Sequence, residues 1–433
     1  MAAYGRLLRN RPFATLWLGA TASLIGDALT WVSLVWLTIE SGGTAIDIAV
    51  LAVCYTGPVM VGGLLAGLLL DRFDRRRLLI ADNVIRGLAM LSVPVAAALG
   101  VLGQLQLDLV AVVYGLLYMV SLAGFPSILP DLVPDEDLAT ANAMESLSFG
   151  VGGVAGPALA GLLIGVIGAA ANLAIDAASY GIFVACLLAV RIPPPAQADR
   201  PAAGMAPAAA VPTGMAPAGA VPTGTGRSAR GLRPALRFIG RTPAILAITV
   251  MFMAANVGEG MLTVLLPVYS REILGADAAG YGILISVLTA GALAGSTIIG
   301  GIRWPWPLGR SIAAAQLAVG AAALGLVPLP PFGAAAVVLF AVGICSSPLT
   351  IWAQTIRMRL IPAELRGRVF ALLRTLMQST PPAGGLAAGL LLAAGGASAV
   401  TLVIAFVVGV PGLVGLLHPA LSGVGTEAPQ ART

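Results

Sequence analysis

Long runs of apolar residues, each bounded by arginine, glycine or proline, constrain the fold of this chain more than any other feature. A helix needs roughly 20 apolar residues to cross a bilayer, because the hydrocarbon layer is about 30 Å thick and each residue rises about 1.5 Å. The sequence holds twelve such runs, at residues 15–39, 46–70, 78–99, 105–128, 140–166, 170–190, 244–269, 279–300, 311–328, 333–356, 369–393 and 397–417. They predict an all-α integral membrane protein with twelve transmembrane helices.

The composition excludes most other classes of protein. Hydrophobic residues make up 58% of the 433 residues and charged residues only 10%, whereas a soluble domain carries about 25% charged residues. A globule of this size has too little interior to hide so many apolar side chains. Soluble enzymes and nucleic-acid-binding proteins are therefore excluded. ATP-driven transport by this chain alone is disfavoured, because the sequence has no Walker phosphate-binding loop.

The cysteines do not form a pattern that indicates a disulfide framework or a metal site. Cys54, Cys186 and Cys345 each lie inside an apolar run, so they are interpreted as small buried side chains. We expect no metal and no cofactor.

The distribution of the arginines predicts the orientation in the membrane. All 24 basic residues are arginines, and 21 of them fall in loops on one side of the predicted spans. Arg271 lies in a loop on the opposite side, and Arg86 and Arg374 lie within spans. Since positively charged loops stay in the cytoplasm, both termini are expected there. The acidic segment 131–137 is a cytoplasmic loop without arginine.

The longest polar segment divides the predicted spans into two sets of six. We expect an N-terminal bundle at residues 1–190, a cytoplasmic linker at 191–243, a C-terminal bundle at 244–417 and a cytoplasmic tail at 418–433. A tandem decamer at 205–224, MAPAAAVPTG followed by MAPAGAVPTG, is too rich in Pro, Ala and Gly to bury much apolar surface, so the linker is expected to be partly disordered.

The second part of the linker has a helical spacing of arginines. Arg230, Arg233, Arg237 and Arg241 recur every three or four residues, which favours a short amphipathic helix on the anionic inner leaflet. A merely solvated basic stretch is the alternative.

The two halves resemble each other at a shared offset of 228 residues. The matching pairs are Gly63 and Gly291, Gly67 and Gly295, Arg75 and Arg303, Pro134 and Pro362, and Glu136 and Glu364. Glycine matches are common by chance, but a Pro-x-Glu pair and an arginine at the same offset are not. We therefore expect two pseudo-symmetric six-helix bundles, an arrangement known from transporters.

A charged motif runs from the second span into the next loop: Gly63-x-x-x-Gly67-x-x-x-Asp71-Arg72-x-x-Arg75-Arg76-Arg77. It resembles the signature of the major facilitator superfamily in this loop. The glycines would let two helices approach closely, and Asp71 can pair with arginines or lie at a helix N-terminus. The resemblance implies a cytoplasmic latch that ties the two halves together in the outward-open state, formed by Gly67, Asp71, Arg72, Arg75 and Arg76. A basic loop that only sets topology is the alternative. The second-half copy has Ile299 in place of the aspartate, which favours one latch rather than two.

The fifth span carries a second motif, Gly152-x-x-x-Gly156-Pro157-x-x-Ala160-Gly161. It resembles the motif of the superfamily's proton antiporters, with Ala-Gly where Gly-Gly is expected. Small residues at this spacing allow tight helix packing, and a proline kinks the span. The resemblance favours export over import; packing without a coupling role is the alternative.

Two further segments, NRPFATLWLGATASLIGDALTWVSLVWL near the N-terminus and LIPAELRGRVFALLRTL before the eleventh span, are similar to the twelve-span drug:proton antiporter branch. That branch includes macrolide exporters and the enterobactin exporter. The resemblance covers nearly the whole chain apart from the linker.

Carboxylates within the bilayer are candidates for proton coupling, because they are costly to keep there. Asp27 lies near the middle of the first span and Glu259 in the seventh. A carboxylate that alternates between the two sides can carry a proton, since removal from water favours its neutral form and a nearby cation its charged form. Alternatively, each acid only hydrogen-bonds between helices or attracts a cationic substrate.

Other charged residues in the spans are interpreted as structural. Asp82 and Arg86 lie one turn apart in the third span, with Glu145 and Arg374 at similar depth. Because an unpaired buried charge is destabilising, these four are expected to form a gating network with Asp71. Asp176 in the sixth span is interpreted as a polar residue without a transport role.

Substrate contacts follow from the resemblance, which implies that spans 1, 4, 7 and 10 line the central cavity. The candidates on these spans are Trp31, Tyr114, Tyr118, Asn256 and Trp352. Aromatic faces accept lipophilic or cationic molecules with little geometric demand. Trp17, Trp36, Trp304 and Trp306 lie near span ends and are interpreted as interfacial anchors.

The sequence predicts a secondary transporter of the plasma membrane, not an enzyme, that exports lipophilic or amphipathic small molecules such as drugs or antibiotics by proton antiport and alternating access. Its expected partners are a small-molecule substrate, protons and the lipid bilayer, with no nucleic acid, and a monomer is expected. The alternatives are a dedicated exporter of one metabolite, such as a siderophore or a self-made antibiotic, a proton-coupled importer, or a membrane receptor or scaffold that does not transport.

Overall fold

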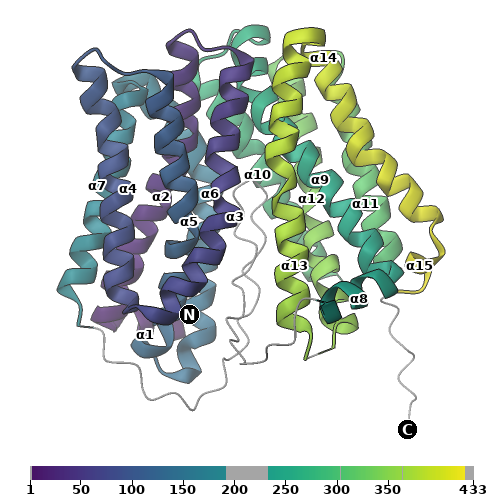
Figure 1. Cartoon of the computed structure of the whole chain (residues 1–433), viewed down its shortest axis with the longest axis horizontal. Coiled ribbons are helices and arrows are strands. Elements are labelled where there is room, and N and C mark those ends of the chain that lie inside the picture. Colours follow the sequence, from purple (N-terminus) through teal and green to yellow (C-terminus); the bar gives the residue numbers. More distant parts are fainter. Residues whose placement is uncertain (1, 192–232, 303, 363, 425–433) are drawn as a thin grey trace. The chain divides into compact units, whose positions relative to one another are not determined.

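The computed structural model describes residues 2–191, 233–302, 304–362 and 364–424, and all regular secondary structure in these ranges is helical. The first half contains α1 (Ala2–Arg9), α2 (Arg11–Glu40), α3 (Ala45–Arg72), α4 (Arg75–Ala98), α5 (Gln104–Leu132), the 3-10 turn η1 (Asp135–Asp137), α6 (Leu138–Ile167) and α7 (Ala169–Ala189). The second half contains α8 (Arg233–Arg241), α9 (Pro243–Val268), the π-helical turn η2 (Tyr269–Ile273), α10 (Ala278–Gly301), α11 (Leu308–Ala323), the 3-10 turn η3 (Leu324–Leu326), α12 (Phe332–Leu360), α13 (Arg366–Gln378), α14 (Thr380–Leu417) and α15 (Pro419–Ser422). Within each half, Figure 1 shows the long helices running roughly side by side. The decamer repeat, Arg230 and Arg303 lie outside the described residues.

The described residues contain eleven continuous helical segments that are long and apolar enough to cross a membrane. The last one, Arg366–Leu417, has 52 residues and would be about 78 Å long, more than twice the thickness of a bilayer. Gly396 interrupts it with φ 73° and ψ −178°, a conformation open to glycine but strained for other residues. The predicted spans 369–393 and 397–417 are therefore separated at this glycine, and the described residues contain twelve candidate spans when this segment is divided there.

Short polar signals start the helices of the first half where the sequence changes from loop to apolar run. The Thr44 side chain accepts a hydrogen bond from the backbone N–H of Asp47, whose carboxylate accepts one from the Thr44 backbone, so α3 begins with a capping box. Asp74 caps α4 by accepting a 2.9 Å hydrogen bond from the Arg77 backbone. These caps fix the ends of the spans at the predicted loops.

The helices form two compact units. Unit 1 contains the described residues up to 191 together with Leu266–Ser286, and unit 2 contains residues 233–265 and the described residues from Val287 onwards. The end of α9, η2 and the start of α10 thus pack with the first half of the chain.

Within unit 1, α3 and α5 approach each other closely through glycines. A Cβ atom on Gly62 would overlap the backbone carbonyl of Leu116, and one on Gly115 would overlap that of Tyr55. The predicted packing residues Gly63 and Gly67 do not make this approach: around Gly67 a Cβ would meet open space. The reason is helical phase, because one residue rotates the contact by about 100°.

In unit 2 the corresponding approach joins α10 and α12. Gly291 lies against the backbone of Phe340, and Gly295 against that of Ile344. In the second half of α3 the small buried residues are Gly62 and Ala66. The closely packed residues of the two halves therefore correspond at an offset that is one residue larger than the offset of the sequence match.

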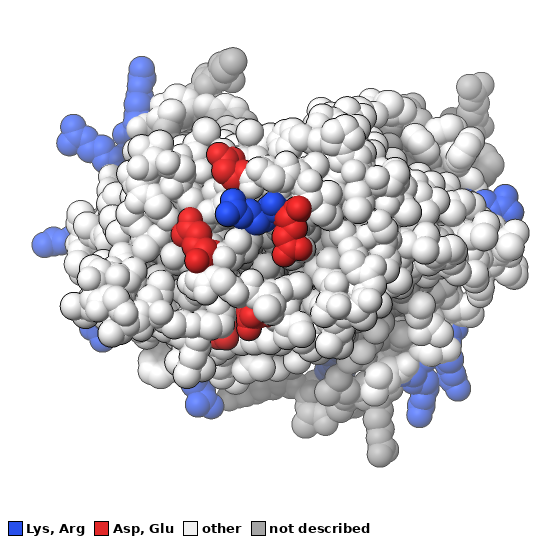
Figure 2. All heavy atoms as spheres, turned by 90° about the horizontal axis from the view of Figure 1, so that it is seen from above, with Lys and Arg blue, Asp and Glu red and all other residues white. Residues whose placement is uncertain are grey.

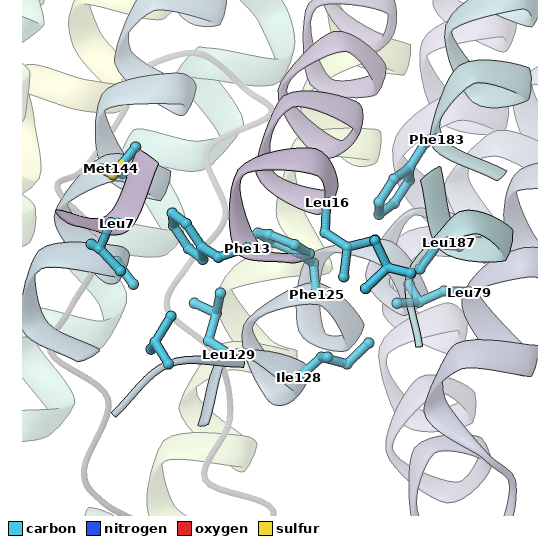
Figure 3. Packing of buried hydrophobic residues seen from close by; sticks show 13 residues of the cluster. Leu7, Phe13, Leu16, Leu79, Phe125, Ile128, Leu129, Met144, Phe183 and Leu187 are labelled. Atoms are coloured by element: carbon cyan, nitrogen blue, oxygen red, sulfur yellow. The ribbon is translucent and has the colours of Figure 1, made fainter. Parts of the chain in front are cut away.

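An apolar cluster closes the end of unit 1 that carries the N-terminus (Figure 3). Leu7 of α1 and Phe13 and Leu16 of α2 pack there with Phe125 and Phe183 of α5 and α7. The helix α1 is tied to the acidic loop next to it by a 2.6 Å bond from the Arg6 guanidinium to Asp137.

The positive charge next to the acidic loop, which has no arginine of its own, thus comes from Arg6 near the N-terminus. Asp137, whose side chain is only 4% exposed, raises the pKa of the Arg6 guanidinium further through this bond and its negative charge. Asn10 adds a 3.0 Å hydrogen bond to the Leu132 carbonyl at the end of α5.

The predicted amphipathic helix forms as α8, Arg233–Arg241. Its Ala235 and Ile239 are buried against Val369 and Leu373 of α13, while Arg237 and Arg241 are exposed. Part of its apolar face is therefore covered by protein, and contact of the other side with the inner leaflet stays a prediction.

The opposite end of the structure has few charges. Seen from that end, the surface is largely uncharged apart from one group of basic and acidic side chains (Figure 2). The charged residues at the helix ends on this side of unit 1 are Glu40, Asp47, Asp108, Arg271, Glu272 and Asp277. The guanidinium of Arg271 lies 5.8 Å from the ring centre of the buried Trp36. This asymmetry agrees with the predicted orientation.

The contrast between Gly62 and Gly63 can be tested by substitution. We expect Gly62→Ala to lower the stability by about 1–3 kcal/mol, because the new methyl group overlaps a backbone carbonyl that cannot rotate away. Gly63→Ala adds the same methyl group one residue later, where its nearest neighbour, the Met119 side chain, lies at an ordinary 3.7 Å. Thermal unfolding of the purified variants, followed by tryptophan fluorescence, measures the difference. Equal unfolding temperatures would contradict the packing described.

Candidate functional site

Four helices of unit 1 bring buried charges together around Arg86. The Arg86 guanidinium is fully buried; its Nη1 lies 3.1 Å from Asp27 Oδ1 and its Nη2 lies 2.9 Å from Asp82 Oδ2. Ser121 of α5 donates a hydrogen bond to Asp82, and the Tyr180 hydroxyl of α7 donates one to Asp27. We call these five residues the Arg86 cluster. Buried charges of this kind are stable only when paired and hydrogen-bonded.

Aromatic rings cover the guanidinium on two sides. The Arg86 Cζ atom lies 4.6 Å from the ring centre of Tyr180 and 5.8 Å from that of Tyr114. Such cation–π contacts are worth more in a dry environment than in water. They add to the two ion pairs in holding the cation inside the bundle.

Helix phase and a glycine explain why these side chains meet. Asp82 and Arg86 are four residues apart on α4 and therefore share one face. Gly26 of α2 faces α7, where a Cβ atom would overlap Ser179 and Asp176. The backbone of α2 thus approaches α7 closely enough for Asp27 to reach Tyr180.

Asp27 also lines a cavity within unit 1. The cavity has a volume of about 60 Å³, enough for a few water molecules. It is lined by residues of α2, α5, α6 and α7, among them Trp17, Thr21, Asp27, Tyr118, Phe125, Glu145 and Phe183. Asp27 is 14% exposed, whereas Arg86 is 0% exposed. The cluster therefore has one carboxylate that borders open space.

The predicted network differs from the observed one in its members. Asp82 and Arg86 pair, but their third charged partner is Asp27. Asp71 is exposed in the last turn of α3 and does not belong to the Arg86 cluster. Glu145 lies on the cavity wall of unit 1, and Arg374 lies on α13 in unit 2.

Sequence reasoning also missed several members. Ser121 and Tyr180 were not considered, and Asp176 was interpreted as lacking a role although it is fully buried next to the cluster. The spacing of Asp176 and Tyr180, four residues apart on α7, is a signal that they share a face. Arg357 is one of the 21 arginines that the sequence predicts in loops on one side. It lies within α12 and is only 5% exposed, because this helix continues to Leu360, beyond the predicted span 333–356.

The basic residues of the predicted latch bind to unit 1 itself. Arg75 donates a 2.6 Å hydrogen bond to the Ser127 carbonyl of α5. Arg76 donates hydrogen bonds of 2.7 and 3.0 Å to the carbonyls of Leu187 and Leu188 at the end of α7. Carbonyls at helix C-termini carry partial negative charge. Asp71 and Arg72 are exposed.

The antiporter-like motif of α6 packs closely on two neighbours within unit 1. A Cβ atom on Gly152 would press on Leu24 of α2 and one on Gly156 would overlap Ala28. On the other side, Gly161 lies against the backbone at Ala278. Pro157 lies inside α6, and the next backbone N–H, that of Ala158, donates a 3.0 Å hydrogen bond to the Ser286 hydroxyl.

The aromatic candidates fall into two groups. In unit 1, Trp31, Tyr55, Tyr114 and Tyr118 form a continuous row with ring-centre distances of 5.0, 4.6 and 5.6 Å. Trp31 also donates a 3.1 Å hydrogen bond to the Tyr281 hydroxyl. Tyr55 was not among the predicted residues. Trp17, interpreted as an anchor, lines the cavity instead.

In unit 2, Trp352 packs on Trp304 with ring centres 4.9 Å apart. Asn256 of α9 donates a 2.8 Å hydrogen bond to the Met377 carbonyl. Glu259 lies one turn further along α9, between Gly258, packed on Val408, and Gly260, packed on Pro381. Among the described residues no hydrogen-bond donor to the Glu259 carboxylate is found. Asp27 and Glu259 belong to different units.

Comparisons with known proteins agree with this architecture. The family model for the Major Facilitator Superfamily matches residues 16–385. The chain is 24% identical to the multidrug efflux pump Tap of Mycolicibacterium fortuitum, covering 94% of this chain and 95% of that protein. It is 26% identical to macrolide efflux protein A of Streptococcus pyogenes over 42% of this chain and 45% of that protein. The crystal structure of a bacterial homologue of the human lysosomal transporter Spinster, inward-facing and unoccupied, has a TM-score of 0.67 at 16% identity, covering 95% of each chain.

The role of Arg86 as a shared counter-ion predicts a strong effect on stability. Arg86→Met leaves Asp27 and Asp82 buried without their cation, so we expect a loss of about 3–5 kcal/mol. Adding Asp82→Asn should restore part of this loss, because it removes one of the unpaired charges. Arg77→Met, at an exposed position, is the control and should have no effect. Thermal unfolding measures all four proteins; an Arg86→Met variant as stable as the wild type would refute the shared ion pair.

Proposed function

The chain belongs to the major facilitator superfamily of secondary transporters, and on this basis we propose that it exports lipophilic or amphipathic small molecules in exchange for protons. The superfamily consists of multi-pass membrane transporters rather than enzymes, so a small-molecule substrate and a membrane location follow from membership. Export, proton coupling and the class of substrate are the proposal.

The proposal of proton coupling rests on Asp27, which is paired with a buried cation and also borders a cavity. Its carboxylate pairs with Arg86 at 3.1 Å and at the same time borders the cavity. Binding of a proton neutralises Asp27 and weakens its attraction to Arg86, whereas release restores it. Since the two residues lie on α2 and α4, protonation changes how strongly these helices are held together. That dependence is what a coupling carboxylate requires.

Two observations support export. Relatives that cover 94% and 97% of the chain are named multidrug efflux pump Tap, and α6 carries the motif that resembles proton antiporters. Within unit 1 this motif packs α6 on α2, the helix of Asp27, through Gly152 and Gly156. A change in the position of α2 is therefore transmitted directly to α6.

The row of aromatic rings supports a lipophilic or amphipathic substrate. Trp31, Tyr55, Tyr114 and Tyr118 offer flat faces with few hydrogen-bonding demands, which suits molecules of varied shape. The guanidinium of Arg86, 5.8 Å from the ring centre of Tyr114, places a charged group beside the third ring of the row. A dedicated exporter of a single metabolite is the second candidate within the same class; it differs in transporting one compound of a broad panel instead of many.

Glu259 is the second candidate for the coupling carboxylate. It lies in the middle of α9 without a cation partner among the described residues. An acid in this position binds a proton without breaking an ion pair. When the proton is released, its negative charge has no cation partner among the described residues, so it is suited to attract a cationic substrate as well. The latch is proposed at Asp71 and Arg72, whose side chains are exposed in the last turn of α3, while Arg75 and Arg76 bind carbonyls of α5 and α7 within unit 1.

We expect Asp27→Asn to abolish transport driven by a pH gradient. Accumulation of fluorescent lipophilic compounds from the medium into everted membrane vesicles with an imposed gradient measures this directly. Asp27→Glu, which keeps a titratable carboxylate, should retain part of the activity. Glu364→Gln, at an exposed position in unit 2, is the matched control. Full activity of Asp27→Asn together with loss in Glu259→Gln would move the coupling site to Glu259, and absence of transport of every compound by the wild type would reject broad-range export.

The latch predicts that Asp71→Asn lowers the transport rate at least tenfold and alters its pH dependence without lowering stability. Asp74→Asn is the matched control, because it removes the same charge three residues away but keeps a good helix cap. Transport rates in vesicles and unfolding temperatures of the purified proteins distinguish the two variants. A normal rate and pH profile for Asp71→Asn would refute the latch.

A further inference from the structure

A line of buried polar groups continues from the Arg86 cluster along the contact between α2 and α7. Next to the cluster lies Asp176, which accepts hydrogen bonds from the hydroxyls of Thr30 and Ser179. One turn closer to the start of α7, Asn172 donates a 2.9 Å hydrogen bond to Ser33. Asp176, Asn172, Thr30 and Ser33 all have an exposed fraction of 0%. Polar residues fully buried inside a membrane bundle are costly and therefore call for an explanation.

The line points toward the end of unit 1 opposite the N-terminus. α7 begins at Ala169 and α2 ends at Glu40, so Asn172 and Ser33 lie nearer to that end than Asp27 does. The Oδ1 atom of Asn172 is buried and has no hydrogen-bond donor among the described residues. An acceptor in this position fits a water molecule or a hydrated proton.

The charges around Arg86 do not balance if every acid is ionised. Within the described part of unit 1, three buried carboxyl groups, those of Asp27, Asp82 and Asp176, surround a single guanidinium. Three negative charges and one positive charge leave a net charge of two units in a region without bulk water. Uncompensated charges in such surroundings are neutralised by proton binding.

The three carboxyl groups differ in their partners. Asp82 pairs with Arg86 within one helix and both side chains are at most 1% exposed, so this pair is permanent. Asp27 pairs with the second guanidinium nitrogen and borders the cavity. Asp176 has hydroxyl partners only and lies close enough to Asp27 for their charges to interact. It is the carboxyl group that gains most from a proton.

We propose that Asp176 is a second proton-binding site, which holds a proton and exchanges it with Asp27. This inference deepens the proposed function, on which its role in transport rests. The groups that face Asp176 are Asp27 and Thr30 from α2, Tyr55 from α3, Arg86 from α4, and Ser179 and Tyr180 from its own helix. Protons reach Asp176 along the Asn172 and Ser33 pair, and Thr30 aligns the carboxyl group. Asp27 is then the inner proton site, which exchanges protons with the cavity. Asp176 is the outer proton site, which exchanges protons with the line of polar groups.

Infrared difference spectroscopy of the purified full-length protein tests this site without any substrate. A protonated carboxyl group buried from water gives a C=O stretching band separate from that of an ionised one. We expect the wild type in lipid nanodiscs to show such a band at neutral pH that Asp176→Asn lacks. Titration with a pH indicator should show one fewer bound proton in Asp176→Asn. Glu272→Gln, at an exposed position, is the matched control and should keep both signals.

A second variant keeps the test valid if Asp176→Asn does not fold. Thr30→Val removes the hydroxyl group that donates to Asp176, so it should shift the band without abolishing it. The proposal is overturned if Asp176→Asn keeps the band unchanged. It is also overturned if the band of Thr30→Val has the same frequency as that of the wild type. Because no transport is measured, this outcome is separate from a failure of proton-driven export in vesicles.

Discussion

The buried guanidinium of Arg86 sets the arrangement of unit 1. A cation inside a membrane bundle must be neutralised by protein groups, since no water or lipid headgroup reaches it. Asp82 supplies one partner from the same helix, and the other comes from α2. Tyr180 and Ser121 satisfy the carboxylates from α7 and α5. Four spans therefore depend on one side chain for their mutual position.

Small residues make this arrangement possible. The carboxylate of Asp27 reaches Arg86 and Tyr180 only because α2 approaches α7 at Gly26, where no Cβ fits. The same device brings α3 to α5 at Gly62 and α6 to α2 at Gly156. Between lipids, helices gain little from apolar association, so close backbone contact and internal hydrogen bonds provide the specificity. The glycine contacts bring the helices close enough for the buried polar groups to bind each other, so the two features stabilise the same packing.

Because Asp27 is ion-paired and also borders a cavity, its protonation is linked to the packing of the helices. An acid that is only buried would be a fixed structural element, and an acid that is only exposed would titrate without consequence for packing. Asp27 is paired with Arg86 and accessible at once, so a change in its charge alters the force between two helices. Glu259 lacks the ion pair, and Asp176 lacks the contact with open space. The three acids therefore offer three different responses to a proton.

The twelve spans, the asymmetry of the arginines and the family signature could be read from the sequence, because they depend on hydropathy and on residues close together along the chain. The pairing of Asp82 with Arg86 was also predictable, since four residues on one helix share a face. The partnership of Arg86 with Asp27 and the place of Asp176 were not, because they join α2, α4 and α7 across 59 to 146 positions of the chain. Helical phase decided the packing of α3, where Gly62 rather than Gly63 lies against the backbone of α5. Asp71 lies exposed in the last turn of α3 and does not belong to the Arg86 cluster. A sequence specifies which residues share a helix face, but which faces meet is fixed only when the helices pack, because contact distances then depend on every small residue between them.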